Sequence, residues 1–156
     1  MRTIISRLTA TDPSTTPLIL RLVFAIVIWP HGAQLLLGYF GGYGYTGTMQ
    51  YFTTQAGLPA AIAFLVIMLE FFGSLFILLG LFTRFFAAAS IILFLDMIVT
   101  VHQQNGFFMN WYGSAKGEGF EYHLLVIGIL LTLIISGAGK ASVDALIYNK
   151  TNTSKQ

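Results

Sequence analysis

The apolar segment at residues 58–82 contains a single ionisable side chain, that of Glu70. The segment is about 25 residues long, and about 20 apolar residues in a helix are enough to cross the hydrocarbon core of a bilayer. Counted along such a helix, Glu70 lies near the middle of the membrane. A carboxylate at that depth costs about 3 kcal/mol even on the lenient insertion scales, so it must face protein or water and find a partner. The rest of the chain has to supply those surroundings.

The composition indicates an integral membrane protein. Of the 156 residues, 56% are hydrophobic and 9% are charged, whereas a soluble domain carries about 25% charged residues. The net charge of +2 is too small, in a chain this apolar, to indicate a nucleic-acid partner. The sequence has no cysteine, which excludes disulfides, thiolate nucleophiles and dithiol redox chemistry. Any redox activity therefore needs a bound cofactor, a metal held by nitrogen and oxygen ligands, or a partner protein.

Four apolar segments are expected to cross the membrane, at residues 18–40, 58–82, 85–102 and 120–136. They predict an all-α fold, an integral membrane antiparallel four-helix transmembrane bundle. We expect a transmembrane domain at residues 17–144, a cytoplasmic N-terminal segment at residues 1–16, and a cytoplasmic C-terminal tail at residues 145–156. The lipid bilayer is then the protein's main partner, and a homo-oligomer is compatible with the sequence.

Basic residues predict the orientation, because short cytoplasmic loops carry an excess of Lys and Arg. In a four-span chain, one side receives Arg2, Arg7, Arg84, Lys140, Lys150 and Lys155. The opposite side has Lys116, which is balanced by Glu118. Both termini should therefore be cytoplasmic, and the two long aromatic loops should face outward.

Seven polar side chains within or near the spans are candidate site residues, all in the middle or outer half of the predicted bundle. They are Glu70 and Asp96 near the midplane, His31 and Gln34 in the outward half of the first span, and His102, Glu121 and His123 at the outer ends of the third and fourth spans. We expect Glu70, Asp96 and His31 to be catalytic or proton-carrying, and His102, Glu121, His123 and Gln34 to contact a cofactor or substrate. This asymmetry predicts a polar chamber that opens outward.

Helical periodicity supports the chamber, because residues three, four or seven apart share a face. On each span the polar residue shares its face with small or apolar residues that let helices approach closely. The four faces are Phe24, His31, Gln34 and Gly38; Ala63, Glu70, Gly73 and Ser74; Ala89, Ile92, Asp96 and Gln103; and Glu121, Gly128 and Thr132.

Structural roles compete with these functional ones. Glu121 in a helix's first turn complements the helix dipole, and histidines at helix ends are common at the membrane interface. Glu70, Asp96 and His31 could form a purely structural polar bridge. Elsewhere, Thr83 is expected to cap the third span, and the Ser142–Asp144 segment to cap a final short helix.

Several site chemistries can be compared with the residue spacing. A di-iron carboxylate bundle needs Glu-x-x-His pairs, and none occurs. A haem would need two histidines at one depth, for which only His31 and His123 qualify, and a mononuclear metal site could use the three histidines with Glu70 or Glu121. A buried carboxylate with histidines leading outward is also what a proton relay or a quinone-head site uses. The pattern favours a quinone over a metal or haem.

The motifs that carry a family resemblance succeed one another from about Arg21 to Asp144. In order, they are Arg21; His31-Gly32 with Gln34; GYFGGYG at residues 38–44; Gly57-Leu58-Pro59; Glu70 and Gly73; LLGLFTR ending at Arg84; His102 with Asn105-Gly106-Phe107-Phe108; Glu121-Tyr122; and GAGKASVD ending at Asp144. Together they resemble the DoxX family of small four-helix membrane proteins. Two positions depart from the family pattern: Leu35 stands where relatives often have Lys, and Ser74 stands where they have a second Gly.

The resemblance implies a protein of the bacterial cytoplasmic (inner) membrane. Some members of the family are described as subunits of quinone-linked oxidoreductases, including ones that act on thiosulfate. The sequence thus leads to an accessory subunit of a quinone-linked redox system, with other membrane or periplasmic redox subunits as partners. The alternative is a non-catalytic membrane scaffold or a small-solute carrier that uses the same polar residues as a bridge or a permeation path.

Overall fold

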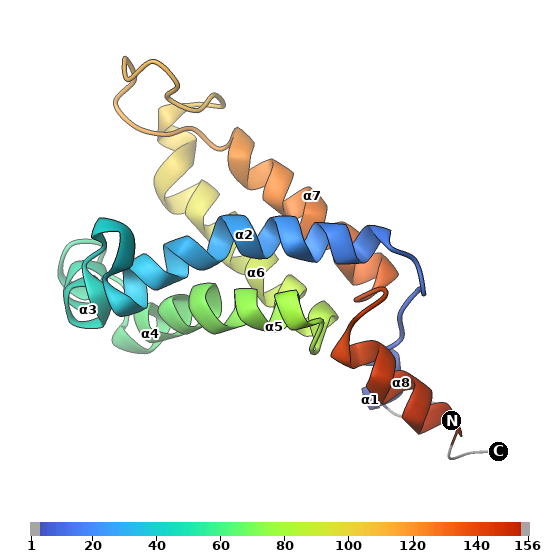
Figure 1. Ribbon diagram of the computed structural model, residues 1–156. Helices are drawn as coiled ribbons and strands as arrows, with labels where there is room; N and C mark the ends of the chain where they lie inside the picture. Colours follow the sequence, from blue (N-terminus) through green and yellow to red (C-terminus); the bar gives the residue numbers. More distant parts are fainter. Residues whose placement is uncertain (1–3, 154–156) are drawn as a thin grey trace.

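The computed structural model describes residues 4–153, which form helices and connecting loops without any strand (Figure 1). The predicted all-α fold is confirmed. Three helical segments are long and apolar enough to cross a membrane, at Thr16–Leu37, Ala60–Leu79 and Thr83–Asn105. A fourth apolar helix, Glu121–Ser136, has 16 residues, or about 24 Å at 1.5 Å per residue. The fourth crossing stays a prediction, and so does the orientation of the chain in the membrane. Two of the basic residues that predict this orientation, Arg2 and Lys155, lie outside the described residues.

The first hairpin pairs α2 (Thr16–Leu37) with the second span. Helix α2 starts with Pro17 in its first turn and ends at Gly38, whose φ of 74° suits glycine. The second span consists of α4 (Ala60–Met68), a π-helical turn η2 (Leu69–Gly73) and α5 (Ser74–Leu79). The short helices η1 (Tyr39–Gly41) and α3 (Gly44–Thr54) connect the two spans.

Gly32 allows the two helices of this hairpin to touch. A Cβ atom at Gly32 would lie 2.5 Å from the backbone nitrogen of Phe71 and 2.6 Å from the carbonyl carbon of Glu70. Only a residue without a side chain permits that approach. The contact therefore seats the π turn that carries Glu70 directly against α2.

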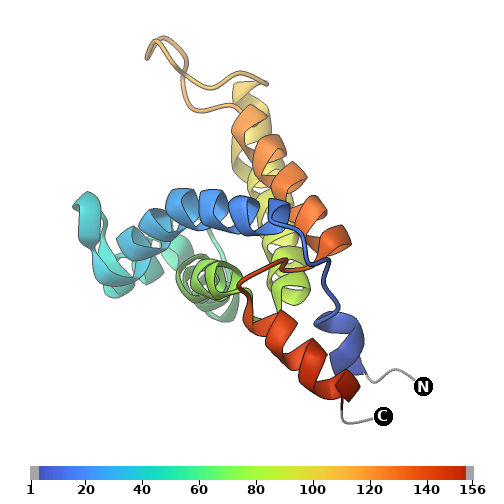
Figure 2. The same cartoon turned by 45° about the vertical axis from the view of Figure 1, so that its right-hand side comes forward.

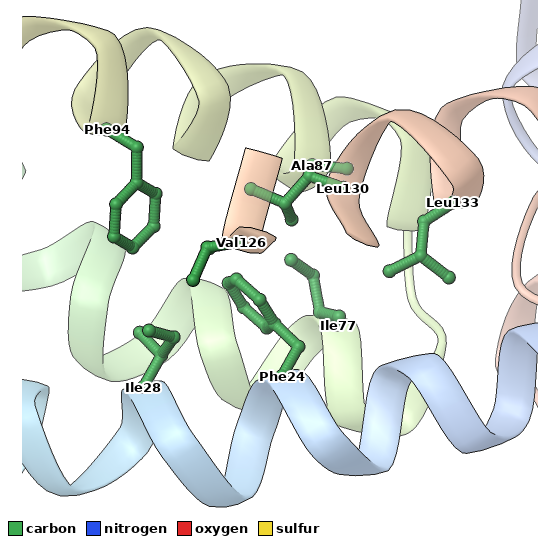
Figure 3. Close-up of a cluster of buried hydrophobic side chains, with 8 residues drawn as sticks. All are labelled: Phe24, Ile28, Ile77, Ala87, Phe94, Val126, Leu130 and Leu133. Atoms are coloured by element: carbon green, nitrogen blue, oxygen red, sulfur yellow. The ribbon is translucent and has the colours of Figure 1, made fainter. Parts of the chain in front are cut away.

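The second hairpin pairs the third span with α7 (Glu121–Ser136). The third span consists of α6 (Thr83–Met97), the π turn η3 (Ile98–His102) and the 3-10 turn η4 (Gln103–Asn105). Buried side chains from both hairpins form the core shown in Figure 3: Phe24, Ile28, Ile77, Ala87, Phe94, Val126, Leu130 and Leu133. This core holds the hairpins together.

The two hairpins meet at one end and diverge at the other (Figures 1 and 2). The ends of α2, α5, α6 and α7 gather close to α8 (Val143–Thr153), which contacts the N-terminal helix α1 (Ile4–Leu8). At the far end, α3 and the loop after η4 lie well apart. The space near the diverging ends holds the candidate site.

Arg21 and Asp144 join the segments at the converging end. Arg21 is fully buried, and its Nη2 donates to the carbonyl of Ala141 at 3.0 Å. The Asp144 carboxylate accepts hydrogen bonds from the backbone N–H groups of Phe82 (2.8 Å) and Thr83 (2.9 Å), so it caps α6. The predicted cap by Thr83 was wrong, since its hydroxyl has no partner among the described residues. Ser142 caps α8 as expected, accepting from the N–H of Ala145 at 3.2 Å.

The predicted helix faces were right on one span and wrong on others. On the second span Ala63, Gly73 and Ser74 are buried with Glu70. On α6 the expected inner face is exposed instead, with Ile92 70% accessible, and on α7 the expected face at Gly128 is exposed too. The buried faces are Ala87, Ser90 and Phe94 on α6, and His123, Val126, Leu130 and Leu133 on α7. Lipid-facing and core-facing residues are equally apolar, so hydrophobicity alone does not separate them.

Replacing the cap at the converging end should destabilise the fold. We expect Asp144→Ala to lower the free energy of unfolding by about 1–2 kcal/mol, because two N–H groups at the start of α6 lose their acceptor. That loss corresponds to a fall in Tm of roughly 2–8 °C in a thermal melt of detergent-purified protein. Asp12→Ala, at an exposed carboxylate, is the matched control and should leave Tm unchanged. Equal melting of both variants would contradict the capping role.

Candidate functional site

A cavity of about 300 Å³ lies between the two hairpins. The first hairpin contributes Ile28 and His31 from α2 and Glu70 from η2. The second hairpin contributes Phe94, Met97, His102, Tyr122 and His123. Met109 and Glu118 come from the loop at residues 106–120, which we call the outer loop. The polar members are His31, Glu70, His102, Glu118, Tyr122 and His123. The cavity brings four of the seven candidate residues together: His31, Glu70, His102 and His123.

Glu70 is buried in the π turn η2, with 8% of its surface accessible. No group among the described residues hydrogen-bonds or pairs with its carboxylate, which lines the cavity instead. The backbone around it is satisfied locally, because the Ser74 hydroxyl lies 2.7 Å from the Glu70 carbonyl and 2.9 Å from that of Phe71 and donates to this pair. Such π turns often occur at functional sites. The turn holds a free carboxylate group at the cavity wall.

His102 and His123 form a pair of rings at the second wall. Their ring centroids are 4.1 Å apart, with a tilt of 43° between the planes. His102 Nδ1 lies 2.8 Å from the carbonyl oxygen of Glu118. Because a carbonyl only accepts, this nitrogen carries the proton, and in the neutral ring Nε2 keeps its lone pair. The Glu118 carbonyl thus fixes the tautomer of His102.

His123 and Tyr122 carry buried polar atoms without partners. His123 is 5% exposed, and its Nδ1 has no hydrogen-bond partner among residues 4–153; the same holds for the Tyr122 hydroxyl. The His123 ring packs against Phe94, with centroids 5.8 Å apart. Buried polar atoms are nearly always hydrogen-bonded, and the two orphaned atoms belong to residues that line the cavity.

Three predicted site residues lie elsewhere. Gln34 Nε2 donates to the Phe40 carbonyl at 3.2 Å and closes the turn after α2. Glu121 Oε1 accepts from the Met109 N–H (2.8 Å) and from Trp111 Nε1 (3.2 Å), so it fastens the outer loop. Asp96 is exposed on the other side of α6 and lines a separate groove. None of the three lines the cavity.

Two cavity residues, Tyr122 and Glu118, are not among the site residues that the sequence predicts. A phenol next to His123 at the start of an apolar helix is the available signal for Tyr122, because buried Tyr hydroxyls need a partner. Glu118 has no such signal, since the path of the loop decides where it lies.

A metal centre is not formed by these residues. Within residues 4–153, no group of three or more His, Asp or Glu side chains is arranged to hold a metal ion. The mononuclear site considered from the sequence therefore finds no support.

Comparisons with known proteins agree with the membrane fold. Residues 16–103 match the DoxX family model. The inner membrane protein YqjF of Escherichia coli is 35% identical over 107 residues, which cover 69% of this chain and 77% of the relative. A Bacillus subtilis protein named "Putative oxidoreductase CatD" is 29% identical over 131 residues, which cover 84% of this chain and 86% of the relative. No solved structure matches the chain.

Removing the orphaned polar atoms should not weaken the fold. We expect Tyr122→Phe and His123→Phe to leave Tm unchanged or to raise it, because each replaces an unpartnered buried polar atom with an apolar group of similar shape. Leu130→Ala, at a fully buried core position, should cost about 2–5 kcal/mol. Thermal melts of the three variants in one detergent make the comparison. A clear loss of Tm in both aromatic variants would show that their polar atoms are structural.

Proposed function

The chain belongs to the DoxX family of membrane proteins, and we propose that it is an accessory subunit of a quinone-linked redox system whose cavity binds the quinone head. The single observation that carries this proposal is that Glu70 lines the cavity from one hairpin and Tyr122 and His123 line it from the other, while the Tyr122 hydroxyl and His123 Nδ1 have no hydrogen-bond partner among the described residues. A ligand between the hairpins can therefore be held from two sides.

The cavity suits a quinone head in size and chemistry. Its volume of about 300 Å³ is at the lower end of small-molecule sites, which is right for one ring with its tail outside. Phe94 and Met97 offer apolar surface to the ring. The Tyr122 hydroxyl can donate a hydrogen bond to a quinone oxygen, which is an acceptor.

A bound quinone supplies two-electron redox chemistry, taking up two electrons and one proton at each oxygen when it is reduced. The residues of the chain then hold and move the protons. Glu70 is placed to hold a proton at the wall formed by η2, and Tyr122 to donate a hydrogen bond from the opposite wall. His102, with its proton fixed on Nδ1, can accept a second proton at Nε2 and pass it toward the outer loop.

We expect the electrons to come from another protein. The chain has no cysteine, and residues 4–153 hold no metal-ligating cluster. A membrane or periplasmic redox subunit is the expected donor or acceptor. The oxidoreductase in the name of the Bacillus subtilis relative and the inner membrane in that of the Escherichia coli relative are consistent with this proposal. We infer the same bacterial membrane here, with both termini cytoplasmic.

Quinone binding tests the proposal directly. We expect short-chain ubiquinone or menaquinone analogues to bind the purified protein saturably. Tryptophan fluorescence measures this binding. Tyr122→Phe and Glu70→Gln should each weaken binding about 3–10-fold, the loss expected for one hydrogen bond of about 1 kcal/mol. Asp96→Asn, which removes a carboxylate outside the cavity, is the matched control and should bind normally.

Two results would reject the proposal. One is the absence of saturable binding by either quinone class in protein with a normal thermal melt. The other is equal affinity of wild type, Tyr122→Phe and Glu70→Gln, since the cavity would then not be where the quinone binds. Either result would favour the scaffold or small-solute carrier instead.

A further inference from the structure

A second cavity lies on the outside of the bundle, between α4 and α6. Its volume is about 390 Å³, and Asp96 is the only ionisable residue that lines it. Every other lining residue is apolar, among them Leu65 and Leu69 on the second span and Ala89 and Ile92 on α6. We call this cavity the Asp96 groove.

The carboxylate of Asp96 has no partner within the described chain. Its side chain is exposed, and no described residue donates to it or pairs with it. The Thr100 hydroxyl, one turn further along, donates to the backbone carbonyl of Asp96 instead, at 2.7 Å. Arg84, on the same span, is about three turns away and donates to the Ile135 carbonyl at 3.1 Å. An unpaired carboxylate within a span marks a functional position.

The Asp96 groove is separate from the cavity between the hairpins. Consecutive residues line the two spaces: Leu69 and Glu70 on the second span, and Asp96 and Met97 on α6. The two helices therefore form a wall with one cavity on each side. An inference about the groove does not depend on the quinone proposal.

We propose that the Asp96 groove binds a lipophilic organic cation, with Asp96 as its counter-charge. The apolar walls accept a hydrophobic body, and the single carboxylate matches one positive charge. Small-molecule sites have this anatomy, with mostly apolar walls, one or two polar groups and a volume of about 300–1,000 Å³. A ligand of this class partitions into the bilayer and reaches an exposed groove from the side.

A second copy of the chain fits the groove less well. A two-fold contact through the same surface brings the same patch of both copies together, so the two Asp96 carboxylates would face each other as like charges. A transmembrane helix of another protein with a central lysine would supply the right charge. The volume of about 390 Å³ is that of a small-molecule site, which favours a small ligand over such a helix.

Binding of tetraphenylphosphonium to the full-length protein in detergent tests the proposal. Tetraphenylborate has nearly the same size and shape and the opposite charge, so it is the matched ligand control. In equilibrium dialysis we expect saturable binding of the cation alone, with affinity at least tenfold lower for Asp96→Asn. Glu70→Gln, which removes the carboxylate of the other cavity, should bind the cation like the wild type.

A second variant tests the groove without touching the charge. Ala89→Phe places a ring in the groove and should also lower affinity for the cation at least tenfold. Thermal melts and size-exclusion profiles check that both variants fold. Loss of binding in both variants supports the proposal.

Three outcomes would overturn it. The first is equal binding of the cation by wild type and Asp96→Asn. The second is equal uptake of tetraphenylborate, which would show simple partitioning. The third is an absence of cation binding together with Asp96-dependent association of a Leu-rich transmembrane peptide that carries one central Lys. The same peptide with Leu in place of Lys is its control. This result would assign the groove to a helix.

Discussion

The position of one carboxylate group within the bilayer constrains the rest of this structure. Glu70 cannot face lipid without a large cost, and the chain meets this requirement with backbone geometry. Gly32 lets α2 touch the π turn, and the Ser74 hydroxyl satisfies the carbonyls within it. The side chain of Glu70 then lines a protein-walled cavity. Four of the other polar residues of the cavity, His102, Glu118, Tyr122 and His123, come from the second hairpin and its loop, across from Glu70.

The opposite end of the molecule determines how the hairpins are arranged. Arg21 binds the carbonyl of Ala141, and Asp144 caps α6. These contacts link the first span, the third span and the C-terminal segment. Since the hairpins are joined here and in the hydrophobic core, their far ends are free to diverge (Figure 2). The outer loop reaches back over the space between them because Glu121 binds its backbone at Met109.

Sequence reasoning predicted the features that depend on length, depth and composition. The helical class and three apolar spans needed only hydropathy and residue counting, while the outward position of the polar groups stays a prediction. Helix rotation was harder: a membrane carboxylate should be buried, which predicts that the face of α6 with Asp96 points inward, yet this face is exposed. Gln34 and Glu121 were predicted to contact a ligand, whereas they bind loop backbone. Loop paths depend on tertiary contacts that no local pattern encodes, and Glu118 was missed for that reason.

The wall shared by the two cavities has an allosteric consequence. Glu70 and Leu69 are neighbours in the chain, as are Met97 and Asp96, yet the members of each pair line different spaces. A shift of α6 across this wall, toward one of the two spaces, would narrow that space and widen the other. Two occupants would then be thermodynamically linked, and each would change the affinity of the other by the same factor. Such linkage would let a ligand taken up from the surrounding lipid change the affinity of the central cavity for its own ligand, without any contact between the two occupants.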